Sequence, residues 1–311
     1  MGKNVIVACD FSEKKQLVEF LDKMEKADKD FYCKVGMELF YSGALKGFSP
    51  VNMIKDRGHK VFLDLKLKDI PNTVASTAKV LATSGVDMIN VHADGGFQMM
   101  KQVVDSVNEI YSDYEKEYEN LVNNHSYPAE ALKDILKKKL ASRPLLLGVT
   151  VLTSMSEEEL RKEIGVNKTP MEQVVSLAKL CKKAGLDGVV CSPQEIMAVK
   201  EACGEDFITV TPGIRFADSK KDDQERIATP ACANIMGSDY IVVGRPITKA
   251  EDAVVAYTRC KKDFTETVTD EAEIANAKRY MEDLKAKMPK DNDWVIIEPI
   301  QGIRSGIQKK K

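Results

Sequence analysis

A charged cluster follows an apolar run that begins at Phe62. Asp64, Lys66 and Asp69 give the spacing Asp-x-Lys-x-x-Asp. Side chains two residues apart on a strand project from the same face, so Asp64 and Lys66 are expected to lie side by side, with the intervening leucines on the other face. Charges on a buried face are costly unless they are paired or used. The pattern predicts a functional charged cluster near the end of a strand, and a surface strand with an incidental ion pair is the alternative.

Eight short apolar segments alternate with helical patterns along the chain. This alternation predicts an α/β fold, a (β/α)8 TIM barrel. A doubly wound open sheet is the alternative, although no Gly-x-Gly-x-x-Gly follows the first strand to mark a dinucleotide-binding version. The predicted strands are residues 4–9, 31–36, 62–67, 88–93, 145–152, 188–191, 208–212 and 240–244.

Chemically capable side chains fall at or just past the ends of six of these strands. In a (β/α)8 barrel the C-terminal ends of the strands converge on one active site. The spread of these residues over strands one, two, three, five, seven and eight therefore predicts a single shared site. They are Asp10, Lys34, Asp64, Lys66, Thr153, Arg215 and Arg245.

Two segments exceed a minimal barrel. We expect the barrel domain to span residues 1–262, with a helical-hairpin insertion at about 105–142, between strands four and five. Residues 263–311 are expected to form a C-terminal extension packed on the barrel. The extension should contain a helix capped by Asp270, a short apolar segment at 294–299 and a frayed end at 308–311.

The composition excludes several classes of protein. The 311 residues include 46 basic and 48 acidic ones, with a pI near 6.1, so nothing indicates attraction to nucleic acid or to an anionic membrane. No apolar run approaches the roughly 20 residues of a membrane span, and the start shows no signal-peptide pattern, which predicts a cytoplasmic protein. Seven scattered cysteines without Cys-x-x-Cys indicate buried thiols, and three distant histidines give no metal site.

The segments 62–66 (Phe-Leu-Asp-Leu-Lys) and 69–73 (Asp-Ile-Pro-Asn-Thr) resemble the signature of the orotidine 5′-monophosphate (OMP) decarboxylase family, in its bacterial type. The resemblance covers roughly residues 3–262 without the insertion. It implies a (β/α)8 barrel that converts OMP to UMP and CO2 in de novo pyrimidine biosynthesis without any cofactor. One departure is Lys68, where relatives often carry His.

The resemblance also implies roles for the charged cluster. Lys66 would stabilise a carbanion at C6 of the pyrimidine and then protonate it. Asp64 would lie beside the departing carboxylate, and Lys34 and Asp69 would complete an alternating Lys-Asp-Lys-Asp array. The residues matching those that bind the ribose are Asp10, Lys34 and Thr73.

Three further segments match substrate-binding positions. Gly244 and Arg245 follow strand eight and are expected to begin a helix. Backbone amides and a guanidinium at this point can bind phosphate. An ordinary turn with a surface arginine is the alternative. By resemblance, Arg215 contacts the phosphate and Gln224 bridges phosphate and base. Thr153 matches a contact to the base, and a helix cap is its alternative role.

A homodimer with shared sites is the last implication of the resemblance. The residues alone leave open whether Asp69 serves its own site or a neighbour's. The family places the matching aspartate, with the residues matching Ile70 and Thr73, in the partner's site. Whether an orotate phosphoribosyltransferase associates with the chain stays open.

Two other functions compete with this one. The sugar-phosphate branch of the superfamily, such as 3-keto-gulonate-phosphate decarboxylase or hexulose-phosphate synthase, shares Asp-x-Lys-x-x-Asp but holds Mg²⁺ with a Glu at the end of strand two. Here Lys34 occupies that position, and a cation there argues against a metal. A non-catalytic nucleotide sensor is the alternative of a different class, and the complete set of charged groups argues against it.

Overall fold

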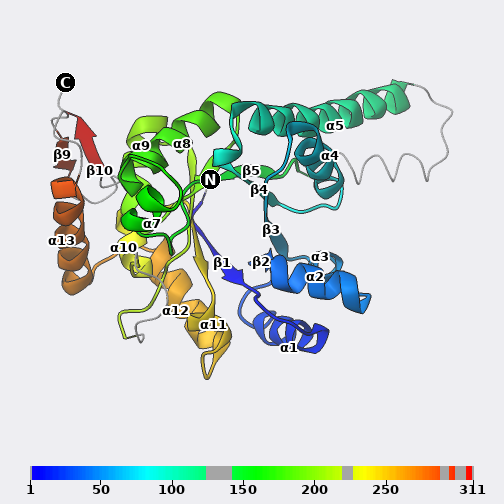
Figure 1. The fold of residues 1–311 in the computed structure, drawn as a ribbon. Coiled ribbons are helices and arrows are strands. Elements are labelled where there is room, and N and C mark those ends of the chain that lie inside the picture. Colours follow the sequence, from blue (N-terminus) through cyan, green and yellow to red (C-terminus); the bar gives the residue numbers. More distant parts are fainter. Residues whose placement is uncertain (1, 124–141, 219–226, 288–293, 298–305, 310–311) are drawn as a thin grey trace.

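The computed structural model describes residues 2–123, 142–218, 227–287, 294–297 and 306–309. Eight parallel strands close into a barrel, in which β8 pairs back onto β1 (Figure 1). The predicted (β/α)8 barrel is therefore confirmed, and the open sheet is wrong. The strands are β1 (Asn4–Ala8), β2 (Tyr32–Gly36), β3 (Lys60–Leu67), β4 (Met88–His92), β5 (Leu145–Val149), β6 (Gly188–Val190), β7 (Ile208–Thr211) and β8 (Tyr240–Val243).

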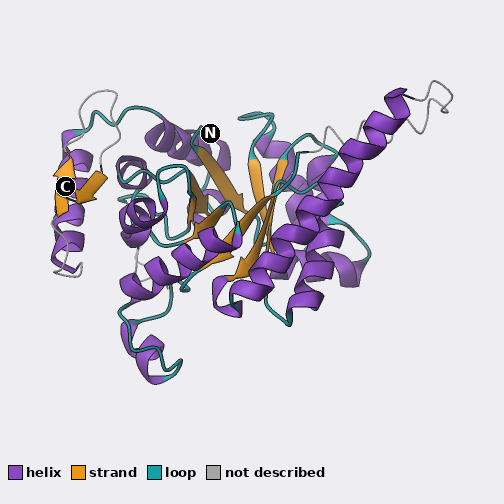
Figure 2. Ribbon diagram, turned by 90° about the horizontal axis from the view of Figure 1, so that it is seen from above, coloured by secondary structure: helices purple, strands orange, loops and turns teal. Residues whose placement is uncertain are grey.

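Helices surround the strands, as the view from above shows (Figure 2). The helices on the N-terminal half of the barrel are α1 (Lys14–Met24), α2 (Met37–Lys46), α3 (Pro50–Lys55), α4 (Pro71–Ala82), the 3-10 turn η1 (Ala93–Gly95) and α5 (Phe97–Asn123). The remainder are α7 (Glu157–Lys162), α8 (Pro170–Ala184), η2 (Pro193–Glu195), α9 (Ile196–Cys203), α10 (Pro230–Ile235), α11 (Arg245–Thr248), α12 (Ala253–Thr265) and α13 (Glu271–Lys287). In the part of the chain that is described, no helix is both long and apolar enough to span a membrane.

Helix α2 was not predicted from the sequence. It starts directly after β2 and ends at Gly47, whose left-handed φ of 70° suits a glycine. Its exposed side carries Met37, Tyr41 and Leu45, so no polar stripe distinguishes it from a buried segment.

The core has two layers because each strand is buried on both faces. Along β1, Ile6 points into the barrel while Val5 and Val7 point toward the helices. Burial on both faces explains why the strands are continuous apolar runs in the sequence. The inner layer comprises Ile6, Ala8, Tyr32, Phe62, Met88, Leu147, Ile208, Val210, Tyr240 and Val242.

Three strands are preceded by an aspartate with the same contacts at the N-terminal face of the barrel. Asp87, Asp187 and Asp239 immediately precede β4, β6 and β8, and each follows a glycine two residues earlier. Each carboxylate accepts a backbone N–H from the preceding strand. Asp87 accepts that of Val61 at 2.8 Å, Asp187 that of Leu146 at 2.7 Å, and Asp239 that of Thr209 at 2.9 Å. Each carboxylate also pairs with one cation. Asp87 pairs with Lys55 at 2.8 Å, Asp187 with Arg143 at 2.8 Å, and Asp239 with Lys200 at 2.5 Å.

Helix α5 contains both a barrel helix and the first arm of the predicted insertion. It runs without a break for 27 residues and projects beyond the barrel (Figure 1). Its first turns, with Met100, Val103 and Val107 buried, lie against α4 and α8. The rest of the predicted hairpin, including the break at Tyr127, lies outside the described residues.

The C-terminal segment forms a helix and a small sheet. Asp270 Oδ1 accepts the backbone N–H groups of Ala272 and Glu273 at 2.8 and 3.2 Å, which confirms the predicted cap of α13. Strands β9 (Trp294–Ile297) and β10 (Gly306–Lys309) pair antiparallel, and β10 lies beside α9. Residues 308–309 belong to β10, so the predicted frayed end is wrong for them. A lysine is well tolerated on an edge strand.

Candidate active site

Four charged side chains form one chain of contacts at the C-terminal face of the barrel. Lys66 Nζ lies 2.7 Å from Asp64 Oδ1, and Asp64 Oδ2 lies 3.3 Å from Lys34 Nζ. Lys34 Nζ also contacts Asp10 Oδ1 at 3.0 Å. The structure thus brings together these four predicted site residues, which come from β2, β3 and the segment just after β1. The alternative of an incidental ion pair on a surface strand is wrong.

The electrostatics keep Asp64 and Lys34 ionised. Burial raises the pKa of Asp64, but Lys34 and Lys66 outweigh it, so the pKa of that carboxyl lies below its usual value. Burial likewise lowers the pKa of Lys34, and Asp64 and Asp10 outweigh it, so the pKa of Lys34 lies above its usual value. At neutral pH the site therefore holds two buried opposite charges with a fixed geometry.

Gly36 makes room for the Lys34 ammonium. A Cβ atom at this position would lie 2.9 Å from Lys34 Nζ and 3.3 Å from Asp10 Oδ1. Carbon so close to the ammonium would push it away from the two carboxylates. No pattern in the sequence marks Gly36, because its role depends on where the side chain of Lys34 turns.

Strand β3 departs from regular alternation at Lys66. Its φ is 52°, and it is the one residue other than glycine with a positive φ in the described part of the chain. The left-handed region costs an L-residue roughly 1–2 kcal/mol. The pairing of β3 with β4 also shifts register between Leu63 and Leu67. The strand ends at Leu67 as predicted, but its alternation is irregular at Lys66, and Asp64 and Lys66 still meet.

Asn90 on β4 belongs to this site and was missed in the sequence. Its side chain is 1% exposed. It donates from Nδ2 to Asp64 Oδ1 at 2.6 Å, and its Oδ1 accepts the backbone N–H of Lys66 at 2.8 Å. The available signal was an amide residue inside the apolar run of a doubly buried strand.

Asp69 does not join the charged chain of contacts within its own chain. Its Oδ1 accepts the N–H of Ile70 at 2.6 Å, and its side chain is exposed on the loop before α4. Ile70 is 67% exposed and Thr73 is exposed as well. The predicted array of Lys34, Asp64, Lys66 and Asp69 is thus not formed within one chain. Asp10 takes the place of Asp69 as the fourth charged residue.

The predicted phosphate segment lies next to the charged chain of contacts. Gly244 caps α11, and a Cβ there would lie 3.5 Å from Ala8 Cβ and 3.9 Å from Asp10 Oδ2. Arg245 is exposed at the first position of α11. The end of β8 therefore places both residues beside the end of β1, where a ligand of Asp10 could also reach them.

The loop after β7 is closed at its base by a pair of backbone hydrogen bonds. Arg215 N–H donates to Ala228 O at 3.0 Å, and Ala228 N–H donates to Gly213 O at 3.1 Å. The half-buried side chain of Arg215 donates to Ile214 O at 2.9 Å. Gln224 lies outside the described residues.

Thr153 lies in a turn rather than at a strand end. Strand β5 stops at Val149, so the strand expected through residue 152 was too long. The helix-cap alternative for Thr153 is wrong, because Ser156 caps α7 and forms a capping box with Glu159. Thr153 is half-buried.

Lys68, the departure from the family pattern, pairs with a residue after β4. Its Nζ lies 2.7 Å from Asp94 Oδ2, and His92 Nδ1 lies 3.6 Å from the other oxygen of Asp94. The pair connects the loop that carries Asp69 to η1. Lys68 therefore points away from Asp64.

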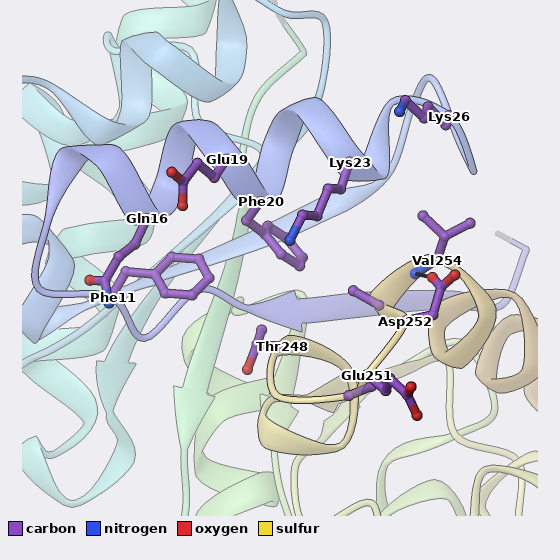
Figure 3. Close-up of a pocket in the computed structure, with 12 residues that line it drawn as sticks. Phe11, Gln16, Glu19, Phe20, Lys23, Lys26, Thr248, Glu251, Asp252 and Val254 are labelled. Atoms are coloured by element: carbon purple, nitrogen blue, oxygen red, sulfur yellow. Dashed lines mark hydrogen bonds between the residues drawn. The ribbon is translucent and has the colours of Figure 1, made fainter.

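A hollow of about 440 Å³ lies between α1 and the segment from α11 to α12 (Figure 3). Lys23 and Lys26 line it from the α1 side, and Glu251 and Asp252 line it from the other. None of the predicted site residues lines this hollow. It is therefore separate from the charged chain of contacts.

The cysteines and the acidic residues form no further centre among the residues described. All seven cysteines are free and buried, as predicted. No group of three or more His, Cys, Asp or Glu side chains in the described ranges is arranged to hold a metal ion.

Comparisons with known proteins agree with the fold and identify the family. The model of the family described as "Orotidine 5'-phosphate decarboxylase / HUMPS family" matches residues 3–260. The chain is 45% identical over 264 residues to orotidine 5'-phosphate decarboxylase of Bacillus cytotoxicus, covering 85% of this chain and 98% of the relative. The enzyme of the same name from Bacillus mycoides is 44% identical over the same shares.

Two solved structures show the same barrel. Orotidine 5'-phosphate decarboxylase from Lactobacillus acidophilus superposes with a TM-score of 0.66 at 40% identity, covering 85% of this chain and 100% of that one. An uncharacterized conserved protein from Geobacillus kaustophilus gives 0.64 at 36% identity, covering 84% and 99%. A family match over most of the chain, together with relatives of this identity, shows that the chain belongs to the orotidine 5'-phosphate decarboxylase / HUMPS family.

Proposed function

We propose that this chain is a carboxy-lyase that decarboxylates OMP to UMP and CO2 in pyrimidine biosynthesis. The observation that carries the proposal is the chain of contacts Lys66–Asp64–Lys34–Asp10 at the C-terminal face. Active sites of (β/α)8 barrels lie at this face. Relatives named orotidine 5'-phosphate decarboxylase support the same substrate and reaction for this chain.

Lys66 is proposed as the electrostatic stabiliser and proton donor. Loss of CO2 leaves a carbanion at an sp² carbon, which the ring π-system does not delocalise. A preorganised cation beside that carbon stabilises the charge, and an ammonium also supplies the proton. Lys66 is suited to this role because its side chain is 28% exposed, while Asp64 fixes its Nζ from the other side.

Asp64 is proposed to act against the bound carboxylate. Two like charges about 4 Å apart repel by about 4 kcal/mol at an effective dielectric near 20. The repulsion disappears as CO2 forms, so it raises the free energy of the bound substrate more than that of the transition state. Lys34 and Asn90 prevent Asp64 from turning away, because they contact its two oxygens.

The remaining predicted residues are proposed to bind the rest of the nucleotide. Their binding energy, remote from the reacting carbon, offsets the cost of placing the two carboxylates together. No cofactor takes part in this scheme. The ribose would be bound by Asp10, Lys34 and Thr73, the base by Thr153, and the phosphate by Arg215, Gln224, Gly244 and Arg245.

The proposal is tested by assaying the purified protein with OMP and comparing two lysine variants. Lys66→Ala should lower kcat at least a thousandfold while UMP still binds, because the loss of a donor and a charge is worth several kcal/mol. Lys68→Ala is the matched control, since Lys68 pairs with Asp94, and its kcat should stay within about twofold. Wild-type protein without activity on OMP, or an active Lys66→Ala, would refute the assignment.

A metal-dependent sugar-phosphate reaction is the competing function. Its Mg²⁺ ligand on strand two is replaced here by Lys34, whose ammonium lies between two carboxylates at 3.0 and 3.3 Å. Activity on OMP should therefore withstand EDTA. Loss of activity on chelation, restored by Mg²⁺, would favour the sugar-phosphate branch.

We also propose that the protein acts in the cytoplasm as a homodimer whose sites are shared, without nucleic acid or membrane partners. The exposure of Asp69, Ile70 and Thr73 supports this, because an isoleucine 67% exposed on a catalytic loop is suited to a partner surface. Each site would combine Lys66 of one chain with Asp69 of the other.

Mixing Lys66→Ala with Asp69→Ala chains tests the shared site. A mixed dimer holds one site with both residues intact, and random reassortment makes about half the dimers mixed. About a quarter of wild-type activity should therefore return from two inactive proteins. No recovery, with mixed dimers verified by mass spectrometry, would contradict sharing.

A further inference from the structure

The pairing of β3 with β4 leaves a gap in the ladder beside the charged residues. Leu63 pairs with Ile89, and Leu67 pairs with Val91. Three residues of β3, including Asp64 and Lys66, thus stand opposite the single residue Asn90. A bulge of this kind leaves backbone groups without a ladder partner and redirects side chains.

The side chain of Asn90 fills this gap. Its Oδ1 accepts the N–H of Lys66 at 2.8 Å, in place of a backbone carbonyl. Its Nδ2 donates to Asp64 Oδ1 at 2.6 Å. A single amide, 1% exposed, therefore holds both the left-handed backbone of Lys66 and the carboxylate that faces its ammonium.

We propose that Asn90 is a positioning residue for decarboxylation, acting through Asp64 and Lys66. This inference rests on the proposed function of those two residues. With the Lys66 N–H bound, the φ of 52° is maintained, and the ammonium stays 2.7 Å from Asp64. With one oxygen of Asp64 bound by the amide, the carboxylate keeps its other oxygen toward Lys34.

Both ends of the amide are needed for this role. An aspartate at position 90 has the same shape and still accepts the Lys66 N–H, but its second oxygen faces Asp64 without a proton to donate. Two adjacent buried carboxylates raise the pKa of one of them, so that they share a proton at lower pH. Asn90→Asp should therefore regain the missing donor on acidification.

The experiment compares Asn90→Ala and Asn90→Asp with wild type between pH 5 and 8. In Asn90→Ala, kcat should fall at least tenfold, while the KM for OMP and the affinity for UMP stay within about threefold, because no binding residue is removed. In Asn90→Asp, the ratio of its kcat to that of wild type should rise as the pH falls. A purely structural asparagine would give a constant ratio.

Thr209→Val is the matched control. Thr209 is fully buried, and its Oγ1 contacts Asp239 Oδ2 at 3.2 Å at the opposite face of the barrel. Removing this hydroxyl should lower the melting temperature but leave kcat equal to that of wild type at every pH. This variant separates a loss of stability from a loss of positioning.

Two results would overturn the inference. One is a kcat for Asn90→Ala within twofold of wild type, and the other is a pH-independent ratio for Asn90→Asp. If Asn90→Ala does not fold, the isosteric Asn90→Asp decides alone. An inactive Lys66→Ala beside fully active Asn90 variants would refute only this inference, whereas an active Lys66→Ala would refute the proposed function itself.

Discussion

At the N-terminal face of the barrel, Asp87, Asp187 and Asp239 each bind one cation and one backbone N–H of a neighbouring strand. At the C-terminal face, Asp64 binds two lysines and the amide of Asn90. The first arrangement takes one of its donors from the backbone of a regular strand and the other from a single lysine or arginine. The second depends on side chains that must be placed by a bulge and a glycine.

The Lys200–Asp239 pair is the most enclosed of the three pairs at the N-terminal face, whereas Lys55 and Arg143 are about as exposed as Lys66. The side chain of Lys200 is 5% exposed and its partner Asp239 13%, whereas Lys66 is 28% exposed. A pair enclosed by protein stabilises the fold once formed and is costly to break. A pair with one open side can exchange a partner for a ligand. We therefore expect substitution of Lys200 to change stability and substitutions in the charged chain of contacts at the C-terminal face to change activity.

Among substitutions that leave every charged side chain in place, Gly36→Ala should have a large effect on activity. Its Cβ would lie 2.9 Å from Lys34 Nζ, the far end of a flexible side chain, so the ammonium should move at little cost in stability. Misplacing a catalytic group by about 1 Å can cost on the order of 100-fold in rate. We expect kcat/KM to fall by about that factor with an almost unchanged melting temperature. Full activity would show that Lys34 needs no fixed position.

Lys200→Met should give the opposite result. Its ammonium donates to Glu205 O and Phe207 O as well as to Asp239, and its removal leaves a buried carboxylate without its cation. Breaking such a pair costs about 3–5 kcal/mol. Urea unfolding should show this loss, while kcat at 25 °C stays within about twofold. Lys34→Met, the same substitution at the C-terminal face, should lose activity and keep more stability.

The sequence predicted the barrel and the four members of the charged chain of contacts for one physical reason. Strands buried on both faces are apolar runs, so a charge at the end of a run stands out and marks the C-terminal face. Asp64, Lys66, Lys34 and Asp10 were found in this way. The three aspartates at the N-terminal face were not found, because an aspartate after a glycine turn is also typical of an ordinary loop.

The remaining parts of the site depend on register between strands. The role of Asn90 follows from a bulge in β3, and a bulge cannot be deduced from either strand alone. Gly36 is informative only once Lys34 and Asp10 are known to meet beside it. Asp69 was recognised by its spacing, but its target would lie on another chain, so no pattern within this chain decides its role.

The smallest expected effect concerns two histidines at opposite faces. His59, fully buried against Phe31 before β3, has a lowered pKa, mainly because burial disfavours its charged form, with Arg57 adding to this and Glu25 opposing it. His92, beside Asp94 after β4, also has a lowered pKa owing first to burial, but its side chain is 23% exposed.

A lowered histidine pKa stabilises the fold above the unfolded-state pKa of about 6.5, and this contribution is lost as the pH falls below that value, because the unfolded chain then binds more protons. Each unit of difference is worth about 1.4 kcal/mol. His59→Leu should therefore reduce the loss of stability between pH 7.5 and 5.5, measured by urea unfolding, more than the control His92→Asn does. An equal reduction in both variants, or none in His59→Leu, would show that burial at the N-terminal face does not govern this acid sensitivity.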